Sequence, residues 1–157
     1  LSEIENVKGV KYTATALYEV TQIRERCKPG FQIYGGCDEL GSSNIALGVD
    51  GSIGSFYNVI PDLYLKIWEA VKASDVAKAA QLQGKAVHII MAGLHSGSMM
   101  ACIKAWLRQG GVPAGYARRP FSNFTPEQEG ELMAQLSAID EADGLELDIV
   151  RRFKERR

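Results

Sequence analysis

The run Val7-Lys8-Gly9-Val10-Lys11-Tyr12-Thr13 is the stretch on which the interpretation of the whole chain depends. A strand would alternate its side chains between two faces, with Val7, Gly9, Lys11 and Thr13 on one and Val10 and Tyr12 on the other. The alternation predicts a short strand that sets Lys11 among small and apolar neighbours. Two interpretations follow from the residues alone. A lysine at a strand end usually extends to solvent, whereas an amine beside apolar groups can serve as a nucleophile toward a carbonyl.

Downstream of Thr13 the pattern alternates between helices and strands. A helix with an apolar stripe ends before Pro29-Gly30, and a second strand is expected over 31–34. Asp38 and Glu39 begin a short helix that ends at Gly48, and a third strand is expected over 51–55. Strands joined through helices by short connections predict a parallel α/β sheet.

The chain beyond Pro61 is expected to be helical. Pro61 starts one helix, Ser74 or Asp75 caps the next, and a third is predicted from about Ser98 to Gln109. Thr125-Pro126 is a strong helix start, and that helix is predicted to run to about Ile139. A last helix is expected after Gly144.

Composition excludes several classes of function. A chain of 157 residues with 46% hydrophobic residues and a net charge of −1 suits one globular domain, without a nucleic-acid surface. The basic residues gather near the end, where Asp148 and Glu155 lie at helical spacing from arginines, as in a solvated helix. Three widely spaced cysteines and two histidines favour neither disulfides nor structural zinc, and a cytoplasmic location is expected. We expect no membrane span and no signal peptide.

Polar candidates lie at or just after the carboxyl ends of the predicted strands, which is where α/β barrels and open sheets build their sites. They are Lys11, Asp38, Glu39 and Ser55. For the two acids a purely structural role is also sufficient, because acidic residues at a helix start complement the helix dipole.

Four motifs in order carry a family resemblance: GVKYT at 9–13, YGGCDE at 34–39, GVDGSIGSFYN at 48–58 and GYARRPF at 115–121. Together they resemble the carboxyl-terminal half of the N-acetylneuraminate lyase and dihydrodipicolinate synthase family. These enzymes are Schiff-base aldolases on a (β/α)8 TIM barrel with extra carboxyl-terminal helices. The resemblance implies an α/β fold in which residues 1–73 are the last three βα units of the barrel and residues 74–157 a helical region.

The same resemblance assigns roles to residues. Lys11 matches the lysine that condenses with the keto group of pyruvate or of the substrate. The implied substrate-binding residues are Thr13, Gly36, Asp38, Glu39, Gly54 and Ser55. Paired carboxylates suit a hydroxyl-rich sugar, because each can accept charge-assisted hydrogen bonds from hydroxyls. Neither a metal nor an organic cofactor is implied.

The implied reaction is cleavage of N-acetylneuraminate to pyruvate and N-acetylmannosamine by the full-length enzyme. Alternatives are an aldolase for another 2-keto-3-deoxy sugar acid, a dihydrodipicolinate synthase-like enzyme, or a catalytically silent structural fragment. Departures from the lyase pattern at Ala14-Thr15 and Cys37 leave the exact sugar open. The implied partners are the keto acid or sugar acid, the missing amino-terminal half of the barrel, and further copies in a homo-oligomer, by resemblance a tetramer.

Overall fold

The computed structural model describes residues 1–156, which divide by their internal packing into two compact units. The first comprises Leu1–Gly54 and Lys66–Gln83, and the second comprises Ser55–Leu65 and the chain from Gly84 onward. The two long helices α3 (Pro61–Lys72) and α4 (Val76–His95) therefore contribute residues to both units. The predicted division at residue 73 follows the repeat pattern of a barrel and stays a prediction.

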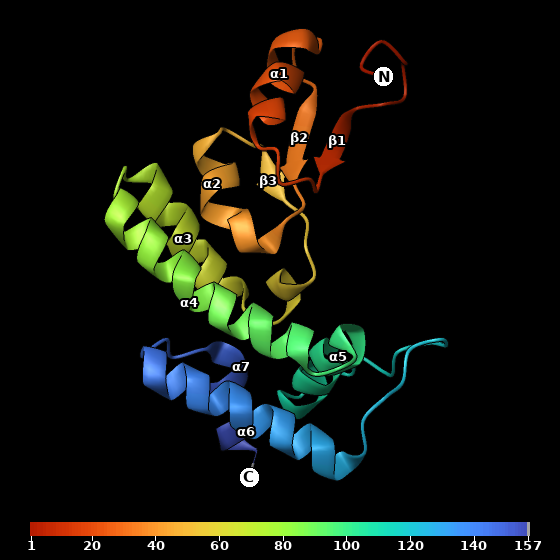
Figure 1. Cartoon of the computed structure of the whole chain (residues 1–157), viewed down its shortest axis with the longest axis vertical. Helices are drawn as coiled ribbons and strands as arrows, with labels where there is room; N and C mark the ends of the chain where they lie inside the picture. The colour runs from red at the N-terminus through yellow and green to blue at the C-terminus, as the bar shows by residue number, and fades with distance from the viewer. Residues whose placement is uncertain (157) are drawn as a thin grey trace. The chain divides into compact units, whose positions relative to one another are not determined.

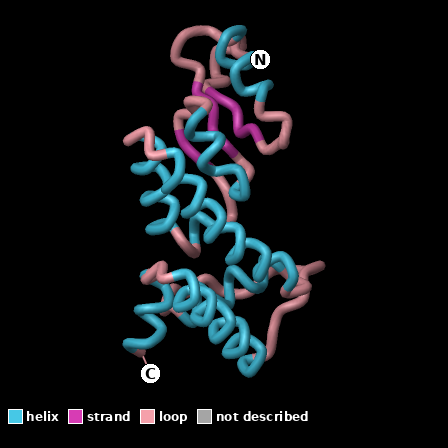
Figure 2. Tube along the Cα trace, turned by 60° about the vertical axis from the view of Figure 1, so that its left-hand side comes forward, coloured by secondary structure: helices cyan, strands magenta, loops and turns pink. Residues whose placement is uncertain are grey.

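A parallel three-stranded sheet in the order β1-β2-β3 forms the centre of the first unit (Figures 1 and 2). Its elements are β1 (Gly9–Tyr12), α1 (Tyr18–Arg26), β2 (Gln32–Gly35), the 3-10 helix η1 (Asp38–Leu40), α2 (Gly41–Ala46) and β3 (Gly51–Ser52). The predicted parallel α/β arrangement is confirmed. The third strand is shorter than the expected 51–55, and its expected last residue, Ser55, has helical backbone angles of φ −75° and ψ −42°.

The strand register sorts the side chains between two faces of the sheet. Val10 pairs with Ile33, and both pack with Val20 of α1 in one apolar cluster. Lys11 pairs with Tyr34 and therefore lies on the opposite face, where its side chain is exposed. The helix-covered face thus supplies the core of this unit, and the other face presents the lysine.

Asp50, immediately before β3, hydrogen-bonds to the backbone of Ile33 through its side chain as well as through its own backbone. The backbone N–H of Ile33 donates to Asp50 Oδ2 at 2.7 Å, and the N–H of Asp50 donates to the Ile33 carbonyl at 2.8 Å. Arg24 donates to the same carboxylate oxygen at 2.6 Å. The hydrogen bond from Arg24, followed by that from Ile33, holds the pKa of Asp50 below its usual range.

The described part of the second unit is helical, as predicted for the later part of the chain. Its elements are η2 (Phe56–Asn58), the start of α3, the second half of α4, α5 (Met99–Gln109), α6 (Pro126–Asp143) and α7 (Asp148–Glu155). Trp106 is fully buried, and its indole N–H donates to the carbonyl of Leu132 at 2.9 Å. Thr125 and Gln128 form a capping box at the start of α6. The helix ends at Asp143, with Gly144 as its C-cap, beyond the predicted end near Ile139.

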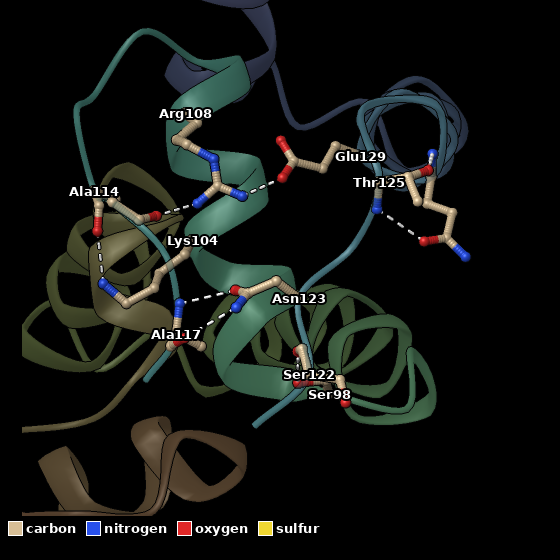
Figure 3. A network of polar contacts seen from close by, with 11 residues as sticks. Ser98, Lys104, Arg108, Ala114, Ala117, Ser122, Asn123, Thr125 and Glu129 are labelled. Atoms are coloured by element: carbon tan, nitrogen blue, oxygen red, sulfur yellow. Dashed lines mark hydrogen bonds and ion pairs between the residues drawn. The ribbon is translucent and has the colours of Figure 1, made fainter. Parts of the chain in front are cut away.

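The loop between α5 and α6, which contains the GYARRPF motif, is held mainly through its backbone (Figure 3). Lys104 donates to the carbonyl of Ala114 at 2.6 Å. Arg108 donates to the carbonyl of Gly115 and pairs with the Glu129 carboxylate. The first two contacts fix the loop against α5, and the ion pair joins α5 to α6.

Among the described residues, no single helix is long and apolar enough to cross a membrane. The helices α4 and α5 pass that test only as a pair, with a bend of 113° at the break between them.

Candidate functional site

Lys11, Thr13 and Gly36 come together at the carboxyl end of the sheet. The N–H of Gly36 donates to the Tyr12 carbonyl at 2.7 Å, which extends the pairing of β1 and β2 by one residue. A Cβ atom built on Gly36 would lie 2.2 Å from Thr13 Oγ1 and 2.8 Å from Lys11 Cε. The side chains of Lys11 and Thr13 therefore lie directly over the backbone of Gly36. Three of the residues predicted from the sequence thus meet in space.

The absence of a side chain at residue 36 has a steric cause. Contacts below about 3 Å between non-bonded carbon atoms lie well inside the optimum separation of about 3.5–4.0 Å. Any larger residue at this position would displace the hydroxyl of Thr13 or the end of the Lys11 side chain. Gly36 consequently leaves room for the Thr13 hydroxyl and for the end of the Lys11 side chain.

Asp38 and Glu39 lie in η1, directly after β2, as predicted. Asp38 is buried, and Glu39 is half-buried. The thiol of Cys37 donates to Glu39 Oε2, with the two atoms 3.1 Å apart. Burial, followed by this hydrogen bond, raises the pKa of Cys37 to about 11, so that the thiol remains a neutral donor near pH 7.

The position of this acidic turn also depends on two residues that the sequence did not reveal as site residues. The buried carboxamide of Gln83, on α4, donates to the Asp38 carbonyl at 3.1 Å and accepts from the N–H of Ser42 at 2.8 Å. Asn44 is buried against Gly35, where an added Cβ would lie 2.8 Å from Asn44 Cγ. Neither contact has a local sequence signal, because a glutamine on a helix and an asparagine near a helix start are usually on the surface.

Gly54 and Ser55 follow β3 in the chain. The N–H of Ile53 donates to the Gly35 carbonyl at 2.9 Å, so that the chain stays beside β2 up to the residue before Gly54. Ser55 belongs to the second unit, where its carbonyl accepts hydrogen bonds from the backbone and the side chain of Asn58. The substrate contacts expected for Gly54 and Ser55 stay predictions.

Tyr12 lies beside Lys11 in the sequence but on the other face of the sheet. Its hydroxyl oxygen is 2.5 Å from Glu19 Oε2 and 2.9 Å from the Ala16 carbonyl oxygen. The hydrogen bond to Glu19 is the main reason that the pKa of Tyr12 rises to about 12. This phenol remains protonated near neutral pH and supports the turn that leads into α1.

Within residues 1–156, no cluster of three or more His, Cys, Asp or Glu side chains is arranged to hold a metal ion. The polar groups that surround the sheet end are instead an amine, hydroxyls, carboxylates and amides. Such a set is equipped for hydrogen bonding to an oxygen-rich organic molecule and for nucleophilic attack by the amine.

Comparison with known proteins identifies the family. Residues 1–139 match the model of the dihydrodipicolinate synthetase family. The chain belongs to this family. It is a family of class I, pyruvate-dependent aldolases, and the relatives to which this chain is similar include several N-acetylneuraminate lyases.

Three of these relatives define the extent of the match. The N-acetylneuraminate lyase of Rhizobium meliloti is 31% identical over 134 residues, which are 85% of this chain and 43% of the relative. The structure of the Fusobacterium nucleatum lyase complexed with pyruvate matches with a TM-score of 0.76 and 32% identity, over 86% of this chain and 45% of that one. A catalytic lysine mutant of the Ruminococcus gnavus sialic acid aldolase matches with a TM-score of 0.78 and 27% identity, over 87% of this chain and 46% of the aldolase chain.

These matches confirm the predicted family and the predicted part of an α/β barrel. They also show that the chain spans less than half the length of the curated relative from Rhizobium meliloti.

Proposed function

We propose that the protein carrying this chain is a Schiff-base aldolase that cleaves N-acetylneuraminate to pyruvate and N-acetylmannosamine, with Lys11 as the nucleophile. The observation that carries the proposal is the placement of Lys11 on the uncovered face of the sheet, with Cε packed over Gly36 beside Thr13. The same position is at the carboxyl end of parallel strands, where α/β barrels place their reactive groups.

The lysine supplies the chemistry of carbon–carbon cleavage. The neutral amine of Lys11 attacks the keto carbon of the sugar acid, and loss of water leaves a protonated imine. The bond to be cleaved then breaks with its electron pair moving into the imine, while the neighbouring hydroxyl loses its proton and becomes the aldehyde of the released sugar. Protonation of the resulting enamine and hydrolysis of the imine release pyruvate and restore the amine.

The acidic turn is suited to binding a polyhydroxylated substrate. The carboxylates of Asp38 and Glu39 can accept hydrogen bonds from hydroxyl groups, and carboxylate acceptors form stronger hydrogen bonds than neutral ones. The similarity to relatives named N-acetylneuraminate lyase supports N-acetylneuraminate as the substrate proposed here. An aldolase for another 2-keto-3-deoxy sugar acid is the nearest alternative, since the residue at Cys37 departs from the aromatic residue frequent in lyases.

Covalent trapping tests the role of the lysine. The full-length protein is incubated with pyruvate and borohydride, which reduces an imine to a stable secondary amine, and the modified residue is identified by peptide mass spectrometry. We expect the adduct on Lys11 in the wild type and its loss in Lys11→Met. The matched control is Lys8→Met, because Lys8 lies three residues earlier and donates to the Glu5 carbonyl at 2.7 Å. An unmodified Lys11, under conditions that label a known aldolase, would refute the proposal.

The substrate is tested separately by comparing cleavage of N-acetylneuraminate with cleavage of 2-keto-3-deoxygluconate. We expect the larger kcat/KM for N-acetylneuraminate. A preference for the shorter sugar acid would keep the Schiff-base mechanism but overturn the assigned substrate.

A further inference from the structure

A single buried side chain, Gln83, joins the two ends of the segment that carries both acids. Its Nε2 donates to the carbonyl of Asp38 at 3.1 Å, and its Oε1 accepts from the N–H of Ser42 at 2.8 Å. Only 8% of Gln83 is exposed. The carboxamide therefore spans the Asp38–Ser42 segment from a helix that lies more than 40 residues later in the chain.

The segment needs support from another part of the chain because it lacks side-chain caps of its own. Cys37, at the N-cap of η1, and Leu40, at the N-cap of α2, make no side-chain capping hydrogen bond. The N–H of Ser42 belongs to the first turn of α2, where backbone N–H groups have no acceptor within the helix. Gln83 Oε1 thus takes the role that an N-cap side chain has in most helices.

The amide nitrogen of Gln83 binds the other end of the turn, at the carbonyl of Asp38. The carbonyl of Asp38 already accepts from the N–H of Gly41, which closes η1. The bond from Gln83 Nε2 uses the remaining lone pair of that oxygen and fixes the direction of the peptide between Asp38 and Glu39. Because the carboxamide is uncharged, it holds the turn without adding a charge beside the carboxylates of Asp38 and Glu39.

We propose that Gln83 is a positioning residue for the sugar-binding part of the site, which orients Asp38 and Glu39 by bridging the ends of their turn. This inference rests on the proposed function, since it assigns the turn to substrate binding. The two hydrogen bonds of Gln83 within the described residues go to backbone atoms of the turn, so its effect on the substrate is transmitted through the two acids.

The test separates sugar binding from imine formation in the full-length protein. Gln83→Met keeps the length of the side chain but removes both hydrogen bonds. Gln83→Glu keeps an acceptor for Ser42 and removes the donor to Asp38. The matched control is Gln81→Met, because Gln81 lies on the same helix with an exposed side chain. Each variant is measured for the KM of N-acetylneuraminate cleavage, for borohydride trapping of pyruvate on Lys11, and for hydrogen exchange of the Ser42 amide.

In Gln83→Met we expect the KM for the sugar acid to rise about tenfold, because part of the free energy of the two lost hydrogen bonds goes into holding the two acids in place. Pyruvate trapping on Lys11 should stay within about twofold of the wild type. The Ser42 amide should exchange about tenfold faster, because it loses the hydrogen bond to Gln83 Oε1. Gln83→Glu should give an intermediate rise in KM, and Gln81→Met should match the wild type.

Two results would overturn the inference: an unchanged KM in Gln83→Met, or equal losses of trapping and sugar cleavage, which would indicate a general structural defect. A wild-type protein that pyruvate does not label would instead refute the proposed function. In that case unchanged Ser42 exchange in Gln83→Met would also refute the bridge itself, whereas faster exchange would retain it as a support of the turn.

Discussion

Replacing Gly36 with alanine tests the geometry on which the candidate site rests. The new methyl carbon would lie 2.2 Å from Thr13 Oγ1 and 2.8 Å from Lys11 Cε. Since comfortable contacts begin near 3.5 Å, the hydroxyl has to move by about 1 Å and the lysine chain by somewhat less. The Lys11 side chain is exposed and can swing away, so the amine is expected to leave its position over the sheet end.

The size of the effect follows from these displacements. A shift of about 1 Å in a reacting group can lower a rate about 100-fold. We therefore expect pyruvate trapping on Lys11 to be about 100-fold slower in Gly36→Ala. Forcing a methyl group into a packed site costs about 1–3 kcal/mol of folding stability, and the lower end applies here because the neighbouring side chains can move outward.

Trapping kinetics by mass spectrometry and urea unfolding followed by circular dichroism measure the two effects on the same protein. Gly84→Ala is the matched control, since a Cβ at this helical position meets no atom within 4 Å. It should trap pyruvate at the wild-type rate and gain about 1 kcal/mol of stability from better helix propensity. Trapping at the wild-type rate in a folded Gly36→Ala protein would refute the placement of Lys11 over Gly36.

Three further predictions concern stability and reactivity. Asp50→Ala should lower the free energy of unfolding, measured by urea titration, by about 2 kcal/mol, because it leaves the buried N–H of Ile33 unpaired. Asp50→Asn retains an acceptor for this N–H and should lose less than about 1 kcal/mol. The pKa of Asp50 is lower in the folded protein than in the unfolded chain, so its carboxylate stabilises the fold fully at pH values above the unfolded pKa. This stabilisation is lost as the pH falls through the folded-state pKa. Equal loss of stability in acid by the wild type and by Asp50→Ala would contradict this. Cys37, with a pKa raised to about 11, should react with iodoacetamide at pH 8 about 100-fold more slowly than an ordinary cysteine. Glu39→Gln should speed the reaction, because it removes the carboxylate to which the thiol donates. Rapid alkylation of the folded wild type would show that the thiol is not buried beside the carboxylate. Thr125→Ala should cost about 1 kcal/mol by removing the capping box, with Thr125→Ser near neutral, and equal loss in both variants would argue against the cap.

Local sequence patterns were sufficient for much of the fold. Alternation predicted β1 around Lys11, and proline at the first helical position predicted the helix starts at Pro61 and Pro126, the second with Thr125 as its cap. These features depend on residues within one turn or one strand, so that they can be seen in a short window. The placement of Lys11 and Thr13 over Gly36 was also within reach, because strand ends of a parallel sheet meet at one edge.

The parts that sequence reasoning missed join residues far apart in the chain. The bridge from Gln83 to the acidic turn crosses more than 40 residues, and its signal is only a glutamine on an amphipathic helix. The side chain of Asp50 supplies a sheet hydrogen bond to Ile33, although an aspartate before a strand usually indicates only a turn. In both cases a polar side chain pairs with a backbone group, and the pairing becomes visible only when the tertiary structure is known.

The way in which the loop between α5 and α6 is held has a consequence for how its sequence can vary. Lys104, Arg108 and Ser98 bind the loop at the carbonyls of residues 114, 115 and 122, and every amino acid carries such a carbonyl. Substitution at residues 114 and 122 should therefore leave these hydrogen bonds in place, whereas residue 115, at φ +62°, favours glycine. Substitution should be tolerated least at the three residues that hold the loop. The anchors lie on or next to α5, so this loop can diversify its exposed face while its path remains set by a neighbouring helix.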